Sequence, residues 1–274
     1  MNKNIQKEIR WLVSEKYNGI ETLEAKQDIA RLTRGEHIDY IIGWVEFAGC
    51  KIDLSARPLI PRAETEFWTE KAIEEIQATA SRTIKFSSRF TPKGLHASRE
   101  MLASLRQIRV LDMFAGSGCV GVAVLKHIEE ARVDFAEKEK RFLGQIEINA
   151  KLNAVDKNHY RVLESDIFSG VRETYDYILA NPPYVAETRK EQVQESVFKQ
   201  EPYDAVFGGK DGLLYIQKFL KGVKARLREG GVVYMEFDSH QKDQVYDMAK
   251  QFGAVHIEIC KDQYNKWRYA RIVF

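Results

Sequence analysis

The sequence has little cysteine, no long apolar run and no excess of either charge. Only three of the 274 residues are cysteine, namely Cys50, Cys119 and Cys260. They lie far apart, show no Cys/His spacing typical of a metal site and leave one thiol over in any disulfide scheme. We therefore predict a protein without a metal site, in a reducing compartment.

The lack of a long apolar run argues against a membrane-spanning helix, which needs about 18 consecutive apolar residues. The first ten residues are polar and charged, unlike the apolar core of a signal peptide. Lys and Arg number 42 and Asp and Glu 40, so the formal net charge is only +2, which disfavours a strongly cationic nucleic-acid binder. These features predict a cytoplasmic protein that makes no membrane contact.

Apolar residues near the amino terminus recur with helical spacing on either side of a break at Asn18-Gly19. The two groups are Ile5, Ile9, Leu12 and Val13, then Leu23, Ile29 and Leu32. They predict a small helical unit.

The next residues change in character twice. From 40 to 61, β-branched and aromatic residues with interspersed glycines predict a β-hairpin. From 64 to 80 helical spacing returns. The inner face of this helix is predicted to carry Trp68, Ala72, Ile73 and Ile76. We expect a helical domain at 1–42, a hairpin linker at 43–62 and a main domain at 63–274.

Residues 81–109 hold seven Lys or Arg residues and one acidic residue, Glu100, a local formal charge of +6. Such a segment suits contact with RNA or with an acidic partner surface. It also suits a solvated, partly helical insertion, which is the simpler interpretation because charge runs usually face water.

After residue 109, short apolar runs alternate with amphipathic stretches, a pattern typical of βαβ units in a parallel sheet with helices on both faces. Strands are predicted at 110–114, 133–137, 161–166, 175–180 and 231–237, and helices at 119–129, 138–152, 188–199 and 240–252. Two more strands, at 255–260 and 269–274, are joined by a link too short for a helical crossover, so one strand is expected to be antiparallel. The fold class is α/β, with a seven-stranded, mostly parallel sheet.

The first of these strands leads into a glycine-rich turn, Asp112-Met113-Phe114-Ala115-Gly116-Ser117-Gly118. Glycines at a strand-to-helix turn let the backbone approach a ligand closely, and the amides at the helix start face that ligand. NAD, a nucleotide or S-adenosylmethionine would each suit such a turn, and a simple tight turn has the same pattern. Nothing resembles a GKS or GKT phosphate loop, which disfavours triphosphate chemistry.

Acidic residues end three successive strands: Asp112, Glu137 and Asp166. Glu137 follows Asp112 by 25 residues, the spacing at which a carboxylate reaches the two hydroxyls of a ribose. Asp166, with Ile167 beside it, is a candidate for contacting an adenine amino group. Each acid alone is equally consistent with a solvent-facing strand end, but ligands of open α/β sheets bind at these carboxyl ends.

The strand at 175–180 leads into Asn181-Pro182-Pro183-Tyr184, which resembles the NPPY motif of class I methyltransferases that act on a planar nitrogen. The resemblance implies that the Asn181 side-chain oxygen and the Pro182 carbonyl accept hydrogen bonds from a substrate NH2, against which Tyr184 packs. An amide nitrogen is a poor nucleophile. Hydrogen bonds to its N–H groups that aim it at a methyl donor would lower the activation barrier of methyl transfer. Adenine, cytosine and glutamine all present such a group, and the motif alone does not choose between them.

Motifs elsewhere in the chain help to choose between adenine, cytosine and glutamine as the substrate. They are Tyr40-Ile41-Ile42-Gly43, Leu59-Ile60-Pro61-Arg62-Ala63-Glu64-Thr65-Glu66, Glu201-Pro202, Gly208-Gly209-Lys210-Asp211-Gly212, Glu229-Gly230-Gly231, Met235-Glu236, and Lys261-Asp262 with Arg268. In order and approximate spacing, residues 40–274 resemble the peptide chain release factor glutamine methyltransferases. This resemblance implies a Rossmann-like class I methyltransferase domain at 63–274, with the helical domain at 1–42 docking the substrate.

The resemblance further implies methylation of the glutamine in the GGQ motif of release factors, which act in translation termination. S-adenosyl-L-methionine is the implied methyl donor. Its implied contacts are Phe114, Ala115, Gly116, Ser117, Gly118, Glu137, Ile167 and Asn181, to which the strand-end pattern adds Asp112 and Asp166. The substrate amide would be held at Asn181, Pro182, Pro183 and Tyr184.

Phe114 stands where the family has the first glycine of the loop, so we expect the backbone to enter the turn without a positive φ. This FAGSG variant and the basic segment also suit an amino-group methyltransferase acting on adenine or cytosine in rRNA or DNA. A ribosomal-protein glutamine is a further alternative, disfavoured by the residues after Arg62. Glu64 and Glu66 suit either the helix dipole or the entrance for the GGQ loop.

Overall fold

The computed structural model describes residues 3–90, 107–192 and 200–274. The strands of the central sheet are β3 (Ile108–Met113), β4 (Ala131–Glu137), β5 (Tyr160–Glu164), β6 (Tyr175–Ala180), β7 (Leu227–Glu236), β8 (His256–Lys261) and β9 (Trp267–Val273). They are ordered β5-β4-β3-β6-β7-β9-β8. Strand β9 is antiparallel to both neighbours, and the other neighbouring pairs are parallel. The predicted seven-stranded α/β fold is confirmed.

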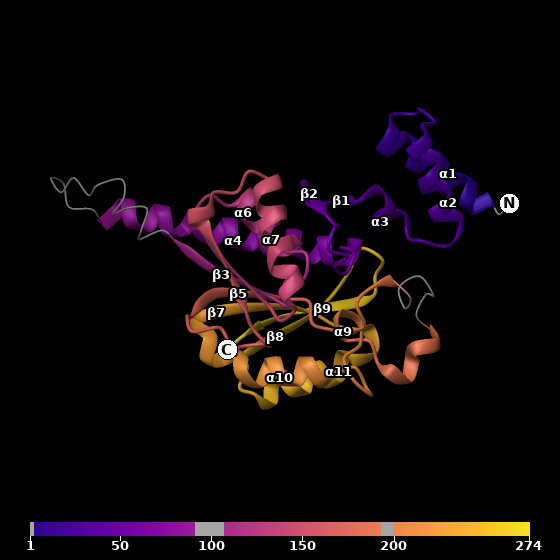
Figure 1. The fold of residues 1–274 in the computed structure, drawn as a ribbon. Coiled ribbons are helices and arrows are strands. Elements are labelled where there is room, and N and C mark those ends of the chain that lie inside the picture. The colour runs from indigo at the N-terminus through magenta and orange to yellow at the C-terminus, as the bar shows by residue number, and fades with distance from the viewer. Residues whose placement is uncertain (1–2, 91–106, 193–199) are drawn as a thin grey trace.

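Helices cover both faces of this sheet. They are α4 (Ala63–Phe90), α6 (Cys119–His127), α7 (Lys140–Leu152), α10 (Leu214–Val223) and α11 (Lys242–Gln251). Figure 1 shows α4, α6 and α7 on one side and α10 and α11 on the other. Val110 of β3 is buried in the first layer of core and its neighbour Leu111 in the second. Because both faces of the strand are covered, its residues form a continuous apolar run rather than an alternating one.

Helix α4 carries the predicted inner face, since Trp68, Ala72, Ile73 and Ile76 are all buried. The helix is longer than expected and continues to Phe90, so the first part of the basic segment is helical. Residues 91–106 lie outside the described part of the chain. The predicted contact of this segment with RNA or an acidic surface therefore falls largely on residues that the structure does not describe.

The hairpin is shorter than the sequence indicated. Its strands are β1 (Trp44–Phe47) and β2 (Cys50–Asp53). Residues 40–42, which we expected to begin the hairpin, instead belong to the short helix α3 (Ile38–Ile42). His37 caps this helix by accepting a hydrogen bond from the Asp39 N–H, and Gly43 ends it with a φ of +91°. Local capping therefore overrides the β propensity of the isoleucines.

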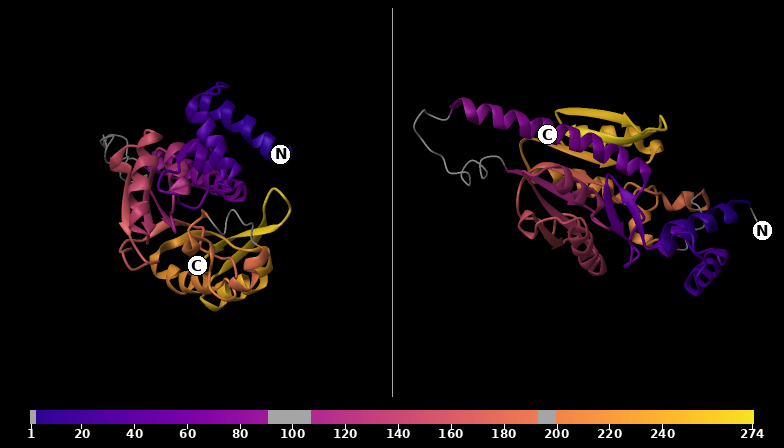
Figure 2. Two further views of the ribbon diagram at one scale, coloured as in Figure 1. Left: turned by 45° about the vertical axis from the view of Figure 1, so that its right-hand side comes forward. Right: turned by 90° about the horizontal axis from the view of Figure 1, so that it is seen from above.

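The predicted amino-terminal helices are confirmed as α1 (Lys3–Tyr17) and α2 (Leu23–Thr33). With α3 they enclose a small apolar cluster of their own, formed by Leu12, Leu32, Ile38, Ile41 and Ile42. Figure 2 shows these helices beside the hairpin and outside the layers of the sheet. Every helix in the described ranges is too short or too polar to cross a membrane.

The connection between β6 and β7 differs in part from the prediction. The helix expected at 188–199 begins as a 3-10 helix, Glu187–Gln192, and residues 193–199 lie outside the described part of the chain. A short helix, α9 (Tyr203–Val206), follows. The helix that packs on the sheet before β7 is α10, which the sequence analysis did not identify.

Candidate functional site

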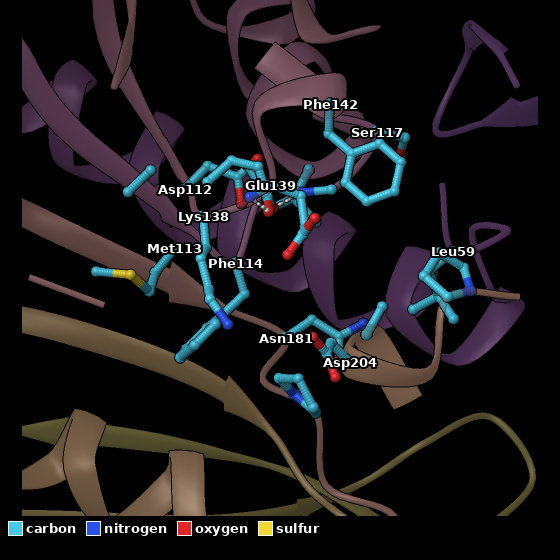
Figure 3. A pocket seen from close by; sticks show the side chains of 18 of the residues that line it. Leu59, Asp112, Met113, Phe114, Ser117, Lys138, Glu139, Phe142, Asn181 and Asp204 are labelled. Atoms are coloured by element: carbon cyan, nitrogen blue, oxygen red, sulfur yellow. Dashed lines mark hydrogen bonds between the residues drawn. The ribbon is translucent and has the colours of Figure 1, made fainter. Parts of the chain in front are cut away.

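A cavity of about 300 Å³ opens at the carboxyl ends of the parallel strands. Figure 3 shows side chains from the loop after β3, from the end of β4 and from the Asn181 turn pointing into it. The predicted site residues that line it are Asp112, Phe114, Ala115, Gly116, Ser117, Glu137, Asp166, Ile167, Asn181 and Pro183. Such a volume is in the range of small-molecule sites.

The other predicted residues lie beside this cavity. Pro182 and Tyr184 line a second cavity of about 180 Å³, with Glu236 and Arg62. Gly118 lies behind the loop, where an added Cβ would come within 3.2 Å of Ile146. Its φ of +77° at the start of α6 explains the choice of glycine.

The expectation that the chain enters the loop without a positive φ is wrong. Phe114 has a φ of +61°, a left-handed conformation that costs a non-glycine residue about 1–2 kcal/mol. The phenyl ring packs against Phe219 and Tyr215, with ring centroids about 6 Å apart. The partly buried ring thus gains packing contacts that a glycine at this position would lack.

Two buried carboxyl groups stand at the ends of β3 and β4. Glu137 accepts hydrogen bonds from the Gly116 N–H at 2.8 Å and the Glu139 N–H at 2.7 Å, and burial raises its pKa. Asp112 accepts from the Gly121 N–H at 2.9 Å. Burial raises the pKa of Asp112 to about 8, opposed by the Gly121 hydrogen bond and reinforced by the nearby Glu137 charge. The Glu137 carboxylate thus helps to fix the glycine-rich loop.

The loop after β5 brings Asp166 and Ile167 to the same cavity. Asp166 is exposed, and its backbone N–H donates to Ser169 Oγ at 2.9 Å. Ile167 has a φ of +52°, unusual for a β-branched residue, and its carbonyl accepts from Ser165 Oγ at 2.5 Å. Strained backbone of this kind concentrates at ligand sites.

Asn181 lies where the two cavities meet, since it lines both, together with Leu59, Arg62 and Ala205. Its Nδ2 donates to Thr65 Oγ1 at 3.3 Å. Within the described ranges no donor reaches its Oδ1, so this oxygen is available as an acceptor. The side chain therefore combines an anchored amino group with a free carbonyl oxygen.

Below this turn lies Glu236, a fully buried carboxylate that sequence reasoning included in a motif without giving it a role. It accepts hydrogen bonds from Thr65 Oγ1 at 2.7 Å, Trp68 Nε1 at 2.6 Å and Tyr184 Oη at 2.8 Å. Burial raises the pKa of Glu236, while these three donors and the Arg268 charge lower it.

Two further features lie beside the turn. Arg62, from the segment after the hairpin, forms an ion pair with the buried Glu201. Gly208 and Gly212 pack so closely that an added Cβ would lie 2.4 Å from the Pro183 carbonyl oxygen and 2.1 Å from that of Tyr184, respectively. The glycines of the 208–212 motif are thus explained by close approach to the Asn181 turn.

Comparison with known proteins places these features in context. Residues 86–210 match the Methyltransferase small domain family. The release factor glutamine methyltransferase of Koribacter versatilis is 31% identical over 227 residues, covering 82% of this chain and 70% of the relative. The enzyme of the same name from Flavobacterium psychrophilum is 26% identical over 262 residues, covering 94% and 83%. That from Thermodesulfovibrio yellowstonii is 29% identical, covering 92% and 79%.

Solved structures share the fold at low sequence identity. The catalytic domain of hMettl16, solved with an RNA hairpin, has a TM-score of 0.56 and 13% identity over 82% of this chain and 75% of that chain. The ribosomal protein L11 methylase of Lactobacillus delbrueckii subsp. bulgaricus has a TM-score of 0.50 and 15% identity, covering 81% and 82%. At such identities these likenesses establish a methyltransferase fold and no substrate.

Proposed function

The chain belongs to the release factor glutamine methyltransferase family, and from this premise we propose that it methylates the glutamine side-chain amide in the GGQ motif of peptide chain release factors. S-adenosyl-L-methionine is the methyl donor of this family. The observation that carries the proposal is the position of Asn181, which lies between a nucleoside-sized cavity and a second cavity that opens beside it.

The larger cavity fits S-adenosylmethionine by the chemistry of its walls. Glu137 would accept from the ribose hydroxyls, since each carboxylate oxygen retains acceptor capacity beyond its backbone hydrogen bond. Ile167 and Phe142 would supply the apolar surface for an adenine ring, and Asp166 would accept from the adenine amino group. The loop from Phe114 to Ser117 would contact the cofactor through its backbone, while Gly118 lets the chain turn into α6 behind it and Asp112 lies beneath.

When bound, the cofactor supplies a methyl group on a positively charged sulfur. The Asn181 Oδ1 and the Pro182 carbonyl would accept the two N–H bonds of the substrate amide, which orients its nitrogen toward the methyl group. Tyr184 would pack against the amide plane in the second cavity. Methylation of the amide nitrogen would release one amide proton to solvent, and the acceptors that hold the two N–H groups would favour its loss.

The proposal extends to the rest of the molecule. Helices α1 to α3 would dock the release factor. This agrees with the predicted division of the chain into a helical docking domain at 1–42, a hairpin linker at 43–62 and a methyltransferase domain at 63–274. The cytoplasm is the proposed location, supported by the three unpaired thiols at Cys50, Cys119 and Cys260.

The test is transfer of a labelled methyl group. The purified protein with labelled S-adenosylmethionine is expected to label a full-length release factor, and replacing the GGQ glutamine with alanine in that factor should abolish the label. Transfer to rRNA or DNA, with the factor unlabelled, would contradict the proposal and favour an amino-group methyltransferase of nucleic acid.

A further inference from the structure

A chain of hydrogen bonds connects the core of the protein to Asn181. Thr65, in the first turn of α4, donates through Oγ1 to Glu236 at 2.7 Å and accepts from Asn181 Nδ2 at 3.3 Å. Trp68 Nε1 donates to the same oxygen of Glu236 at 2.6 Å. Thr65 and Glu236 are 2% and 1% exposed, so both side chains are shielded from bulk water.

The direction of each hydrogen bond in this chain is fixed by chemistry. The Trp68 indole can only donate, so the Glu236 oxygen that faces it must accept. That oxygen, bare in the carboxylate and also in an acid protonated on its other oxygen, accepts from Thr65 as well, which commits the single hydroxyl hydrogen of Thr65 to Glu236. Thr65 then presents only lone pairs to Asn181. The NH2 end of Asn181 satisfies this arrangement and its carbonyl end does not.

The orientation of this carboxamide decides whether the turn can hold a substrate. The two ends of an asparagine side chain have nearly the same shape, so rotation by 180° costs little in packing. In the rotated form the Asn181 NH2 would face the NH2 of a substrate amide, donor against donor. A separate element of the fold must therefore select the form with Oδ1 toward the substrate.

We propose that Thr65 is a positioning residue which, held by Glu236, fixes the Asn181 carboxamide with Oδ1 toward the substrate amide. This inference rests on the proposed function, because it assigns Asn181 Oδ1 to the glutamine NH2. Thr65 acts through Asn181 and is not itself a catalytic residue. Because it aligns an acceptor that orients the nucleophile, its loss lowers kcat more than it weakens cofactor binding.

The test compares variants at Thr65 with a matched threonine on the same helix. Thr65→Val keeps the shape and removes the hydroxyl, and we expect kcat for release factor methylation to fall about 10- to 100-fold, with a much smaller change in the cofactor Kd measured by calorimetry. Thr65→Ser keeps the hydroxyl and should stay within about threefold of wild type. Thr69→Val is the control, because Thr69 is equally buried and donates only to the Thr65 carbonyl at 2.7 Å.

A change at Glu236 gives an independent comparison. In Glu236→Gln the amide oxygen is expected to face Trp68, which can only donate, and Thr65 keeps its direction. The kcat of this variant should therefore fall less than that of Thr65→Val. Should Thr65→Val not fold, as judged by circular dichroism, Thr65→Ala carries the same comparison.

The outcomes separate this inference from the proposed function. If the wild-type protein does not label a release factor, the proposed function fails. If the wild type is active and Thr65→Val retains its kcat, or Thr65→Ser is as slow as Thr65→Val, the positioning role of Thr65 is overturned and the proposed function stands. An equal loss in Thr69→Val would assign the effect to helix stability instead.

Discussion

Asn181 is the single side chain on which the proposed chemistry depends most. Asn181→Ala removes the acceptor for the substrate NH2, and we expect kcat to fall by at least about 100-fold. Cofactor binding should persist in part, because the Glu137 carboxylate and the loop after β3 are untouched. Single-turnover methylation and calorimetry measure the two effects separately, and unchanged turnover would refute the role of Asn181.

Asp112 makes the stability of the cofactor-free protein depend on pH. Its folded pKa is raised from 3.8 to about 8, so the folded state binds a proton that the unfolded state releases. The stabilising contribution is complete below pH 3.8 and is lost as the pH rises through about 8. Asp112→Asn is expected to raise the melting temperature most at pH 9 and clearly less at pH 5, where only part of the contribution has been lost. Asp166→Asn, at an exposed carboxyl, is the control. If Asp112→Asn changed the melting temperature equally at pH 9 and pH 5, the role of Asp112 would be contradicted.

Some site residues could be predicted from sequence because they follow strands directly. Asp112, Glu137 and Asn181 each stand at or just after the end of a predicted strand, and parallel strands bring these ends together. The bond between Thr65 and Glu236 joins residues 171 positions apart. No local periodicity encodes such a pair, so its function becomes visible only once α4 is packed on β7.

Helices and strands also differ in how far the local sequence reveals them. The strands were predictable because burial on both faces makes them continuous apolar runs. Helix α3 was missed because its capping by His37 and Gly43 outweighs a β-rich composition over only five residues. Helix α10 was not predicted, although its buried residues Ile216, Phe219, Leu220 and Val223 recur with helical spacing just after the glycine motif.

The segment at 208–212 gives a test of that support. Gly208→Ala would place a Cβ 2.4 Å from the Pro183 carbonyl oxygen, so the Asn181 turn must shift. We expect a loss of about 1–3 kcal/mol in the free energy of unfolding and at least a tenfold loss in kcat. Gly144→Ala is the control, since its Cβ would meet nothing within 4 Å, and it should leave kcat unchanged. Equal activity in the two variants would remove the segment from the site.

At the scale of the whole molecule, α7 attaches the hairpin to the main domain through amide side chains spaced four residues apart. Gln145, Asn149 and Asn153 each bond backbone groups at or next to β2. Asn149 accepts from the Asp53 N–H at 2.7 Å and donates to the Ser117 carbonyl at 2.8 Å. The hairpin and the glycine-rich loop are thus held by one buried side chain.

Asn149→Ala should therefore destabilise the protein and loosen the cavity together. Leaving buried backbone groups unpaired predicts a loss of roughly 2–4 kcal/mol in the free energy of unfolding. Chemical denaturation measures this loss, and cofactor affinity should fall in parallel. Asn158→Ala, at an exposed amide, is expected to stay within about 0.5 kcal/mol of wild type. A similar small effect at Asn149 would show that the hairpin is held by other contacts.

The amino-terminal helices present apolar side chains to solvent, which is expected of a docking surface for a protein substrate. Trp11 is 47% exposed on α1, and Leu23 is 69% exposed at the start of α2. Trp11→Ala should raise the KM for full-length release factor about fivefold or more, because exposed tryptophans contribute strongly when an interface buries them. The kcat/KM for a short GGQ peptide should not change, since such a peptide reaches only the turn at Asn181. Tyr246→Ala, at a residue 42% exposed on α11, is the matched control. An unchanged KM for the full-length factor in Trp11→Ala would move the docking surface away from this part of α1.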